Sequence, residues 1–218
     1  MKNLFVSFSA DNFLINYLES LGMNVHQVSP GGRTYLPVDA HPDIYFCKMG
    51  VTRHAHLFSG DCREIGCKYP DNVKFNAVCL DGYFIHNLKY SSPALLREAR
   101  ALGLAFINVN QGYTKCNCVV VDGHSIITAD RGIFSAVKKC PDIDVLPISQ
   151  GFVNLDGFQY GFLGGASGRV GGEIIFNGDL SKHPDYEAIT QFIETRGLTI
   201  KDFPEHPLTD IGSILADF

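Results

Sequence analysis

The stretch Asn76–Asn87, NAVCLDGYFIHN, decides the fold because its pattern recurs along the chain. Two apolar runs flank Asp81-Gly82, which predicts a hairpin with a tight turn. Cys118–Asp130, CVVVDGHSIITAD, repeats the pattern with its turn at Asp122-Gly123, and Phe162–Asp179 is a looser copy. Repetition at roughly forty residues indicates a supersecondary unit that buries its apolar face by stacking on its neighbours.

Each hairpin is followed by a predicted helix and a third strand. The helices are expected at Pro93–Leu102, at about Gly132–Lys139 and at Pro184–Thr195. The strands that follow are expected at Leu104–Val109, Asp144–Ile148 and Leu198–Phe203, and the third hairpin has strands near Tyr160–Leu163 and Glu173–Phe176. The unit is therefore strand, strand, helix, strand.

The two ends of the chain are predicted to complete one another. Leu4–Phe8 and Val25–Val28 are predicted strands on either side of a helix at Asn12–Leu21, and Leu208–Leu215 is a last strand with no helix after it. Closed rings of repeats join their termini in one unit in this way. Four units carry a helix, and Asp43–Asp71 is a candidate fifth in which a loop replaces the helix. We expect a single α/β domain over residues 1–218 and leave four versus five units open.

Composition narrows the function. A net charge of −5 disfavours nucleic acid and anionic membranes as partners, because both require a basic face. The apolar runs are too short to span a bilayer, and the N-terminus lacks the pattern of a signal peptide. Seven cysteines, an odd number, favour reduced thiols. We expect a cytoplasmic protein without a cofactor, and homo-oligomerisation stays open.

The chain resembles the penteins, the fold of the guanidino-group-modifying enzymes. More narrowly, it is similar to a small uncharacterised bacterial family assigned to that fold. The runs that carry this resemblance are Gln111–Cys116, Ile127–Gly132, Gly161–Gly168 and Leu208–Ile214. The resemblance implies an α/β propeller with its helices outside and a ligand or substrate with a guanidino or amidino group. Catalytic penteins usually hold their nucleophilic cysteine near the C-terminus, but Asp210–Phe218 contains none.

Acidic and amide residues recur at equivalent points of the units. Second strands end in Asn87, Asp130 and Asp179, whereas first strands begin near Asn76, Cys116 and Asp210. In a ring such positions converge, and converging carboxylates suit a guanidinium, which pairs with them bidentately. The expected ligand-binding residues are Asn87, Asp130, Arg131, Asp179, Asp210 and Ser213. The alternative is that the aspartates, with Asp11, simply cap helices.

Cys116 is the candidate nucleophile. It lies beside Lys115, whose charge is expected to favour the thiolate. A thiolate attacks a guanidinium carbon to form a covalent adduct, and this chemistry requires a general acid or base. His183 is the first candidate for that role and His86 the second. The alternative is that Cys116 is a half-buried structural residue.

Two further features allow other interpretations. His54, His56, Cys62 and Cys67, with Cys47 upstream, suggest a zinc-binding loop, but their spacing is looser than that of structural zinc sites. The glycine-rich run Gly161–Gly172 is expected to be a long flexible hairpin connection, and the alternative is that Gly164-Gly165 lets another backbone or a ligand approach closely. Three hypotheses remain. The first is a divergent pentein that binds or modifies a guanidino or amidino compound without a metal, the second a non-catalytic binding or structural protein of the same fold, and the third a metal-binding protein that uses residues 50–71.

Overall fold

The computed structural model describes residues 2–51 and 54–217. The fold is mixed α/β, which confirms the predicted class, and the strands in the described residues form five small sheets. None of the helices in these two segments is long and apolar enough to cross a bilayer.

The first sheet joins the two ends of the chain. Strand β1 (Lys2–Ser7) lies between β2 (Met23–Val28), to which it is parallel, and β14 (Leu215–Ala216), to which it is antiparallel. Helix α1 (Asn12–Ser20) connects β1 to β2. This pairing confirms the prediction that the terminal segments share one unit.

The second sheet is the candidate fifth unit of the sequence analysis. Strands β3 (Phe46–Met49) and β4 (His56–Ser59) form an antiparallel pair. Short helical turns lie before and after this pair: η1 (Val38–Ala40), α2 (Pro42–Tyr45) and η2 (Cys62–Glu64). The residue pattern of 43–49 predicts one strand, but Pro42 starts a helical turn, so only Phe46–Met49 forms a strand.

The other three sheets repeat the predicted unit. The first of these units consists of β5 (Val78–Leu80), β6 (Tyr83–His86), α3 (Pro93–Ala101) and β7 (Ala105–Asn108), and its three strands form one sheet. The next contains α4 (Thr114–Asn117), β8 (Cys118–Asp122), β9 (Ser125–Thr128), α5 (Arg131–Val137) and β10 (Asp144–Pro147). The last contains β11 (Ser167–Val170), β12 (Glu173–Phe176), η3 (Leu180–Lys182), α6 (Tyr186–Glu194) and β13 (Thr199–Lys201). In each sheet the first pair is antiparallel and the second pair is parallel.

Two predicted strands differ from the structure. The strand expected near 160–163 starts only at Ser167, and of 208–215 only the last residue belongs to β14. In both segments the backbone makes scattered bonds rather than a regular strand ladder. Phe162 N donates to the Asp210 carboxylate, Ser213 N donates to Gly165 O, and Thr209 forms an isolated bridge with Asn154. Gly212 and Ser213 also have positive φ angles, which no extended strand contains.

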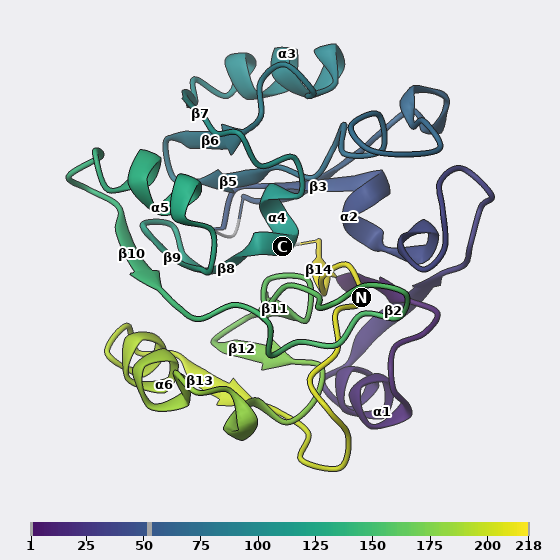
Figure 1. Ribbon diagram of the computed structural model, residues 1–218, viewed down its shortest axis with the longest axis vertical. Helices are drawn as coiled ribbons and strands as arrows, with labels where there is room; N and C mark the ends of the chain where they lie inside the picture. Colours follow the sequence, from purple (N-terminus) through teal and green to yellow (C-terminus); the bar gives the residue numbers. More distant parts are fainter. Residues whose placement is uncertain (1, 52–53, 218) are drawn as a thin grey trace.

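The sheets are packed side by side through their first strands. Strand β3 contacts β5, β5 contacts β8, β8 contacts β11, and β11 contacts β14. The rings of Phe5 and Phe46 lie 4.7 Å apart and join the terminal sheet to the β3–β4 sheet. In Figure 1 these first strands lie toward the middle of the molecule, and α1, α3, α5 and α6 lie at its periphery.

The core consists of apolar clusters that each span two neighbouring sheets. In one of them Val121 and Ile127 pack with Ile174 and Phe176. The others join β5–β6 to β8–β9, β3 to β5–β6, and β1 to β11–β12. A two- or three-stranded sheet cannot bury its own apolar face, so each unit is stabilised mainly by its neighbours.

Gly168 tests this packing. An added methyl group there would collide with the carbonyl oxygen and side chain of Ile214, where β11 meets the segment before β14. We expect Gly168→Ala to destabilise the protein by about 1–3 kcal/mol, a fall in Tm of several degrees. Gly172→Ala is the matched control, because nothing lies within 4 Å of its added methyl group. Equal melting temperatures of the two variants would contradict the proposed tight packing of β11 against the segment before β14.

Candidate functional site

The site is built where first strands begin. Asn76, Cys116 and Ser213 each stand two residues before a first strand, β5, β8 and β14, and Asp43 stands three residues before β3. In the sheet of β11, β12 and β13, the residue two positions before the first strand is Gly165. A Cβ atom at Gly165 would overlap the Asp210 carboxylate. The alternative of close approach at Gly164-Gly165 is thereby confirmed, since a Cβ at Gly164 would also meet the backbone of Cys118.

The Cys116 thiol is held by two polar side chains. Its Sγ donates to Asp43 Oδ2 at 3.0 Å and accepts from Asn76 Nδ2 at 3.3 Å. Asn76 Oδ1 in turn accepts from the backbone N–H groups of Lys115 and Cys116, at 2.8 and 3.2 Å. Asn76 thus fixes both the thiol and the one-turn helix α4 that carries it.

A second set of contacts links Asp43 to the neighbouring sheets. The Ser213 hydroxyl donates to Asp43 Oδ2 at 2.7 Å, and Lys115 Nζ donates to Ser213 Oγ at 3.0 Å and to Gly164 O at 3.1 Å. Ser213 has a φ of 77°, the one positive φ of a non-glycine residue within the described segments. Backbone strain of this kind clusters at functional sites.

Cys116 opens onto a cavity of about 120 Å³. Its polar lining includes His41 and Asp210, whose Nδ1 and Oδ1 atoms lie 3.8 Å apart. Both Asp210 oxygens accept from backbone N–H groups, of Gly212 and Phe162, each at 2.9 Å, so the carboxylate has a fixed orientation. The remaining lone pairs of Asp210 are available to a ligand.

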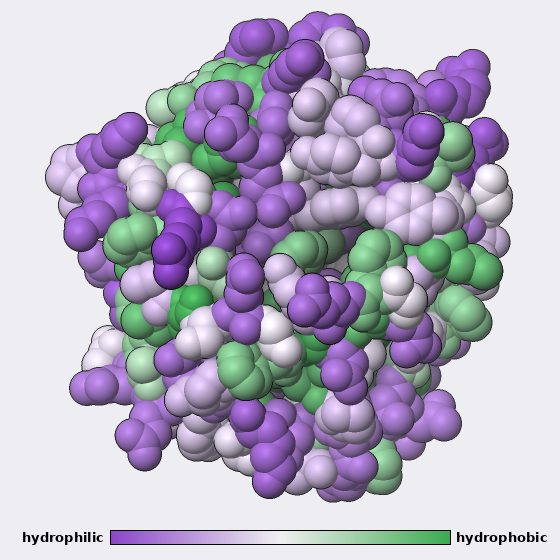
Figure 2. All heavy atoms as spheres, in the orientation of Figure 1, coloured by the Kyte–Doolittle hydropathy of each residue, from purple (hydrophilic) through white to green (hydrophobic). Residues whose placement is uncertain are grey.

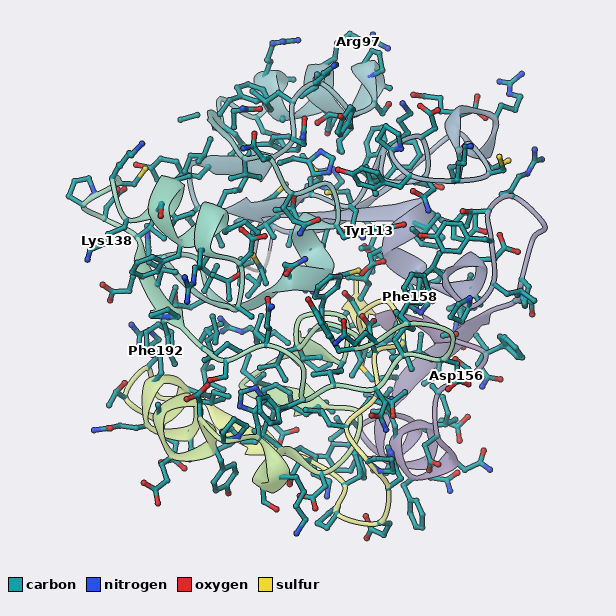
Figure 3. The ribbon with its side chains drawn as sticks, in the orientation of Figure 1. Arg97, Tyr113, Lys138, Asp156, Phe158 and Phe192 are labelled. Atoms are coloured by element: carbon teal, nitrogen blue, oxygen red, sulfur yellow. The ribbon has the colours of Figure 1, made fainter. Side chains whose placement is uncertain are left out.

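The mouth of the cavity is aromatic. Tyr35 and Tyr113 are hydrogen-bonded through their hydroxyl groups at 2.7 Å, and the rings of Tyr35 and Phe158 lie 5.9 Å apart. Tyr113 and Phe158 lie close together near the middle of the face in Figure 3. Figure 2 shows this face hollowed near its middle, with pale and green side chains around the recess. A small ligand with an apolar or cationic surface fits such a mouth.

Burial dominates the electrostatics of the site. It raises the pKa of Asp43, and it raises the pKa of Asp210 to about 6. It lowers the pKa of His41 to about 4, so the contact between His41 and Asp210 joins a neutral ring to a carboxylate at neutral pH. The site thus holds an excess of acidic groups in a water-poor environment.

The expectation that Lys115 favours the Cys116 thiolate needs correction. Burial raises the pKa of the Cys116 thiol well above its usual value, and the carboxylates of Asp43 and Asp210 raise it further. Burial lowers the pKa of Lys115, whose ammonium group bonds to Ser213 and to carbonyl oxygens. The thiol is therefore protonated at neutral pH.

The structure brings together only part of the residue set expected from the sequence. Cys116, Asp210 and Ser213 meet at the site, as first-strand positions, with Asn76. His183 does not pair with Cys116: it lines a different small cavity, its Nδ1 accepts from Asp185 N, and its ring faces Phe152. His86 bonds to Ser91 and to Gly112 O, and so supports the loop before Tyr113.

The second-strand residues lie outside this cavity. Asp130 and Asp179 cap α5 and η3, and Asp11 caps α1, which agrees with the helix-capping alternative. Asn87 donates to Asn110 O and accepts from Lys89 N, and Arg131 begins α5 beside an open groove. These strand ends lead into helices, whereas Cys116, just before β8, and Asp210 line the cavity.

His41 and Asp43 were not singled out from the sequence. Alignment of the 43–49 segment with the other first strands would have placed Asp43 near Asn76 and Cys116, but the helical turn α2 hides that correspondence. His41 caps the same turn from a loop and has no periodic signal. The residues of the suspected zinc loop are dispersed: His56 contacts Glu98, and Cys67 is exposed.

The comparisons with known proteins give a family but no activity. A family model described as a family of unknown function, DUF6873, matches residues 5–215, and the chain belongs to this family. No match was found among curated proteins. No solved structure matches either.

Buried His86 makes a testable contribution to acid sensitivity. Burial lowers its pKa from 6.5 to about 4, so the unfolded chain binds a proton at higher pH than the folded chain does. This contribution is fully present above pH 6.5 and is lost as the pH falls toward 4, on the order of 3 kcal/mol in total. We expect His86→Gln to reduce the dependence of the free energy of unfolding on pH between pH 6.5 and 4, measured by urea denaturation at several pH values. The same substitution at the exposed His124 should leave the slope unchanged, and an unchanged slope in His86→Gln would refute the assignment.

Proposed function

We propose that the chain is a pentein-like α/β propeller that binds a small guanidino or amidino cation and modifies it through Cys116. The observation that carries this proposal is the convergence of a thiol, an imidazole and a carboxylate, those of Cys116, His41 and Asp210, on one cavity. The family resemblance, the shared terminal sheet and the contacts between successive first strands support the propeller arrangement.

The charge of the site supports a cationic ligand. Asp210 is 3 % exposed and its pKa is raised by burial, so a cation in the cavity would relieve an unfavourable buried charge. A guanidinium or amidinium offers parallel N–H donors to both carboxylate oxygens. At about 120 Å³ the cavity is far smaller than the roughly 300–1,000 Å³ of pockets for drug-sized ligands. It accommodates a small head group, and the aromatic mouth then contacts the substituent.

The contacts of Cys116 define the covalent step. The thiol transfers its proton to Asp43 Oδ2, 3.0 Å away, and Sγ attacks the guanidinium carbon to form a C–S bond. The C–N bond to the leaving amine then breaks, and the amine takes up the proton that Asp43 received from the thiol. Water attacks the adduct carbon and releases the thiol. A bound cation favours the first transfer because it stabilises the thiolate.

The alternative is a non-catalytic pentein-fold binding protein. Cys116 is only 3 % exposed, so a ligand can fill the cavity without reaching the sulfur. Alkylation separates the two functions: chloroacetamidine carries a cationic head, and chloroacetamide is its neutral counterpart. The catalytic proposal expects Cys116 to react at least tenfold faster with the cationic reagent, followed by mass spectrometry. Equal slow rates would favour the binding protein.

Ligand binding is tested by thermal shift with methylguanidine, agmatine, arginine and methylated arginines, in the presence of a chelator. At a concentration of about 100 times Kd, we expect Tm to rise by about 5–10 °C with at least one of these compounds. Asp210→Asn should abolish the rise because it removes the buried charge. Asp179→Asn is the matched control, since Asp179 caps a helical turn outside the cavity, and it should keep the rise. No shift with any compound, or an equal shift in Asp210→Asn, would overturn the binding proposal.

A further inference from the structure

The donor atoms around Cys116 resemble a zinc site. Within the described residues, His41, Asp43 and Cys116 form the one group of three or more His, Cys, Asp or Glu side chains whose ligand atoms all lie within 4.8 Å of one another. All three side chains are buried. We propose that they bind a zinc-class divalent ion, in a site separate from the 50–71 segment that the sequence suggested.

An unpartnered carboxylate oxygen points to the same ligand. Asp43 is fully buried, and its Oδ2 accepts from Cys116 and Ser213, whereas its Oδ1 has no hydrogen-bond partner. A buried acceptor without a partner costs about 1–3 kcal/mol or more when charged, and native structures rarely retain one without a reason. A metal ion coordinated by Asp43 satisfies this carboxylate.

The donor chemistry selects the metal. One imidazole nitrogen, one thiolate sulfur and one carboxylate oxygen suit Zn²⁺ or Co²⁺, whereas Ca²⁺ and Mg²⁺ prefer oxygen ligands alone. The ion displaces the thiol proton of Cys116 to solvent. Two anionic ligands then balance the double charge, which lowers the cost of burying it.

Neighbouring groups complete the site. Asn76 Nδ2 donates to the Cys116 sulfur, and Asp210 lies beside the His41 ring, as carboxylates do beside histidine ligands of zinc. Three protein ligands would leave a fourth position for water or another ligand, and two of them, His41 and Cys116, line the cavity. Zinc sites with three protein ligands and an open position are the catalytic type.

The metal and the proposed cation exclude one another. Both require Cys116 and the acidic groups around it, and a metal ion bound to the thiolate lowers the nucleophilicity of the sulfur and occupies the space beside it. Zinc binding therefore predicts a protein in which metal suppresses the Cys116 chemistry. The two proposals fail separately, since metal binding is measured without a guanidino compound and ligand binding with a chelator.

The test is titration of the chelator-treated full chain with Co²⁺, followed by absorption spectroscopy and then by displacement with Zn²⁺. We expect one equivalent of Co²⁺ to produce a thiolate-to-cobalt charge-transfer band together with the visible bands of tetrahedral cobalt. Cys116→Ser should lose the charge-transfer band, and Asp43→Asn and His41→Gln should each raise Kd at least tenfold. Circular dichroism and melting curves establish that each variant is folded.

The matched control is the double variant Cys62→Ser and Cys67→Ser, which removes the thiols of the 50–71 segment. We expect it to bind Co²⁺ like the wild type. Loss of the band in this variant, its persistence in folded Cys116→Ser, or no stoichiometric binding by the wild type would overturn the proposal. If all three ligand variants fail to fold, alkylation of Cys116 in the wild type should still be blocked by one equivalent of Zn²⁺, and unblocked alkylation would refute the site.

Discussion

The structure depends on one constraint: each sheet has too few strands to be stable without packing against other elements. A pair or triplet of short strands has two faces, and the chain buries them against helices and against the next sheet. The apolar clusters accordingly cross from sheet to sheet, as from Val121 to Phe176. This packing draws the first strands together, and the residues before those strands meet as a consequence. The site is thus produced by the same arrangement that builds the core.

Convergence of polar groups on an apolar interior has an energetic cost. Asp43, Lys115 and Asp210 are all nearly or fully buried, and an unpaired charge in such a place is strongly unfavourable. Hydrogen bonds offset part of this cost, because Ser213 joins Lys115 to Asp43 and backbone N–H groups hold Asp210. Asp43 Oδ1 accepts no hydrogen bond, so the cost of burying this carboxylate is only partly compensated. Such residual polarity is expected where a protein keeps a place for a charged ligand.

Local patterns predicted the repeating elements well. The turns at Asp81-Gly82 and Asp122-Gly123 and the helix ends at Gly103 and Gly197 are short-range signals, and hairpins and helices lie where they indicate. The segments at 160–163 and 208–214 escaped prediction because their backbones bond to distant residues. Their apolar side chains carry the same local signal as a strand, so periodicity alone does not separate the two.

The site was predictable where equivalent positions of the repeats lie together, as Asn76 and Cys116 do. His183 follows Asp179 in the sequence, but nearness in sequence does not predict contact with Cys116, and His183 lines a different cavity. His41 and Asp43 precede a strand through a proline-started turn, and this change of local structure concealed them. A base for Cys116 is a long-range relation, and only the packed structure defines it.

The position of Lys115 determines whether a small molecule could pass through the centre of the protein. The Lys115 ammonium group donates to Cys118 O, Gly164 O and Ser213 Oγ, and Lys115 also lines a second, smaller cavity of about 30 Å³. The central region is therefore plugged rather than open from end to end. A small molecule bound in the cavity that Tyr35, Tyr113 and Cys116 line would therefore enter and leave on the same side of Lys115.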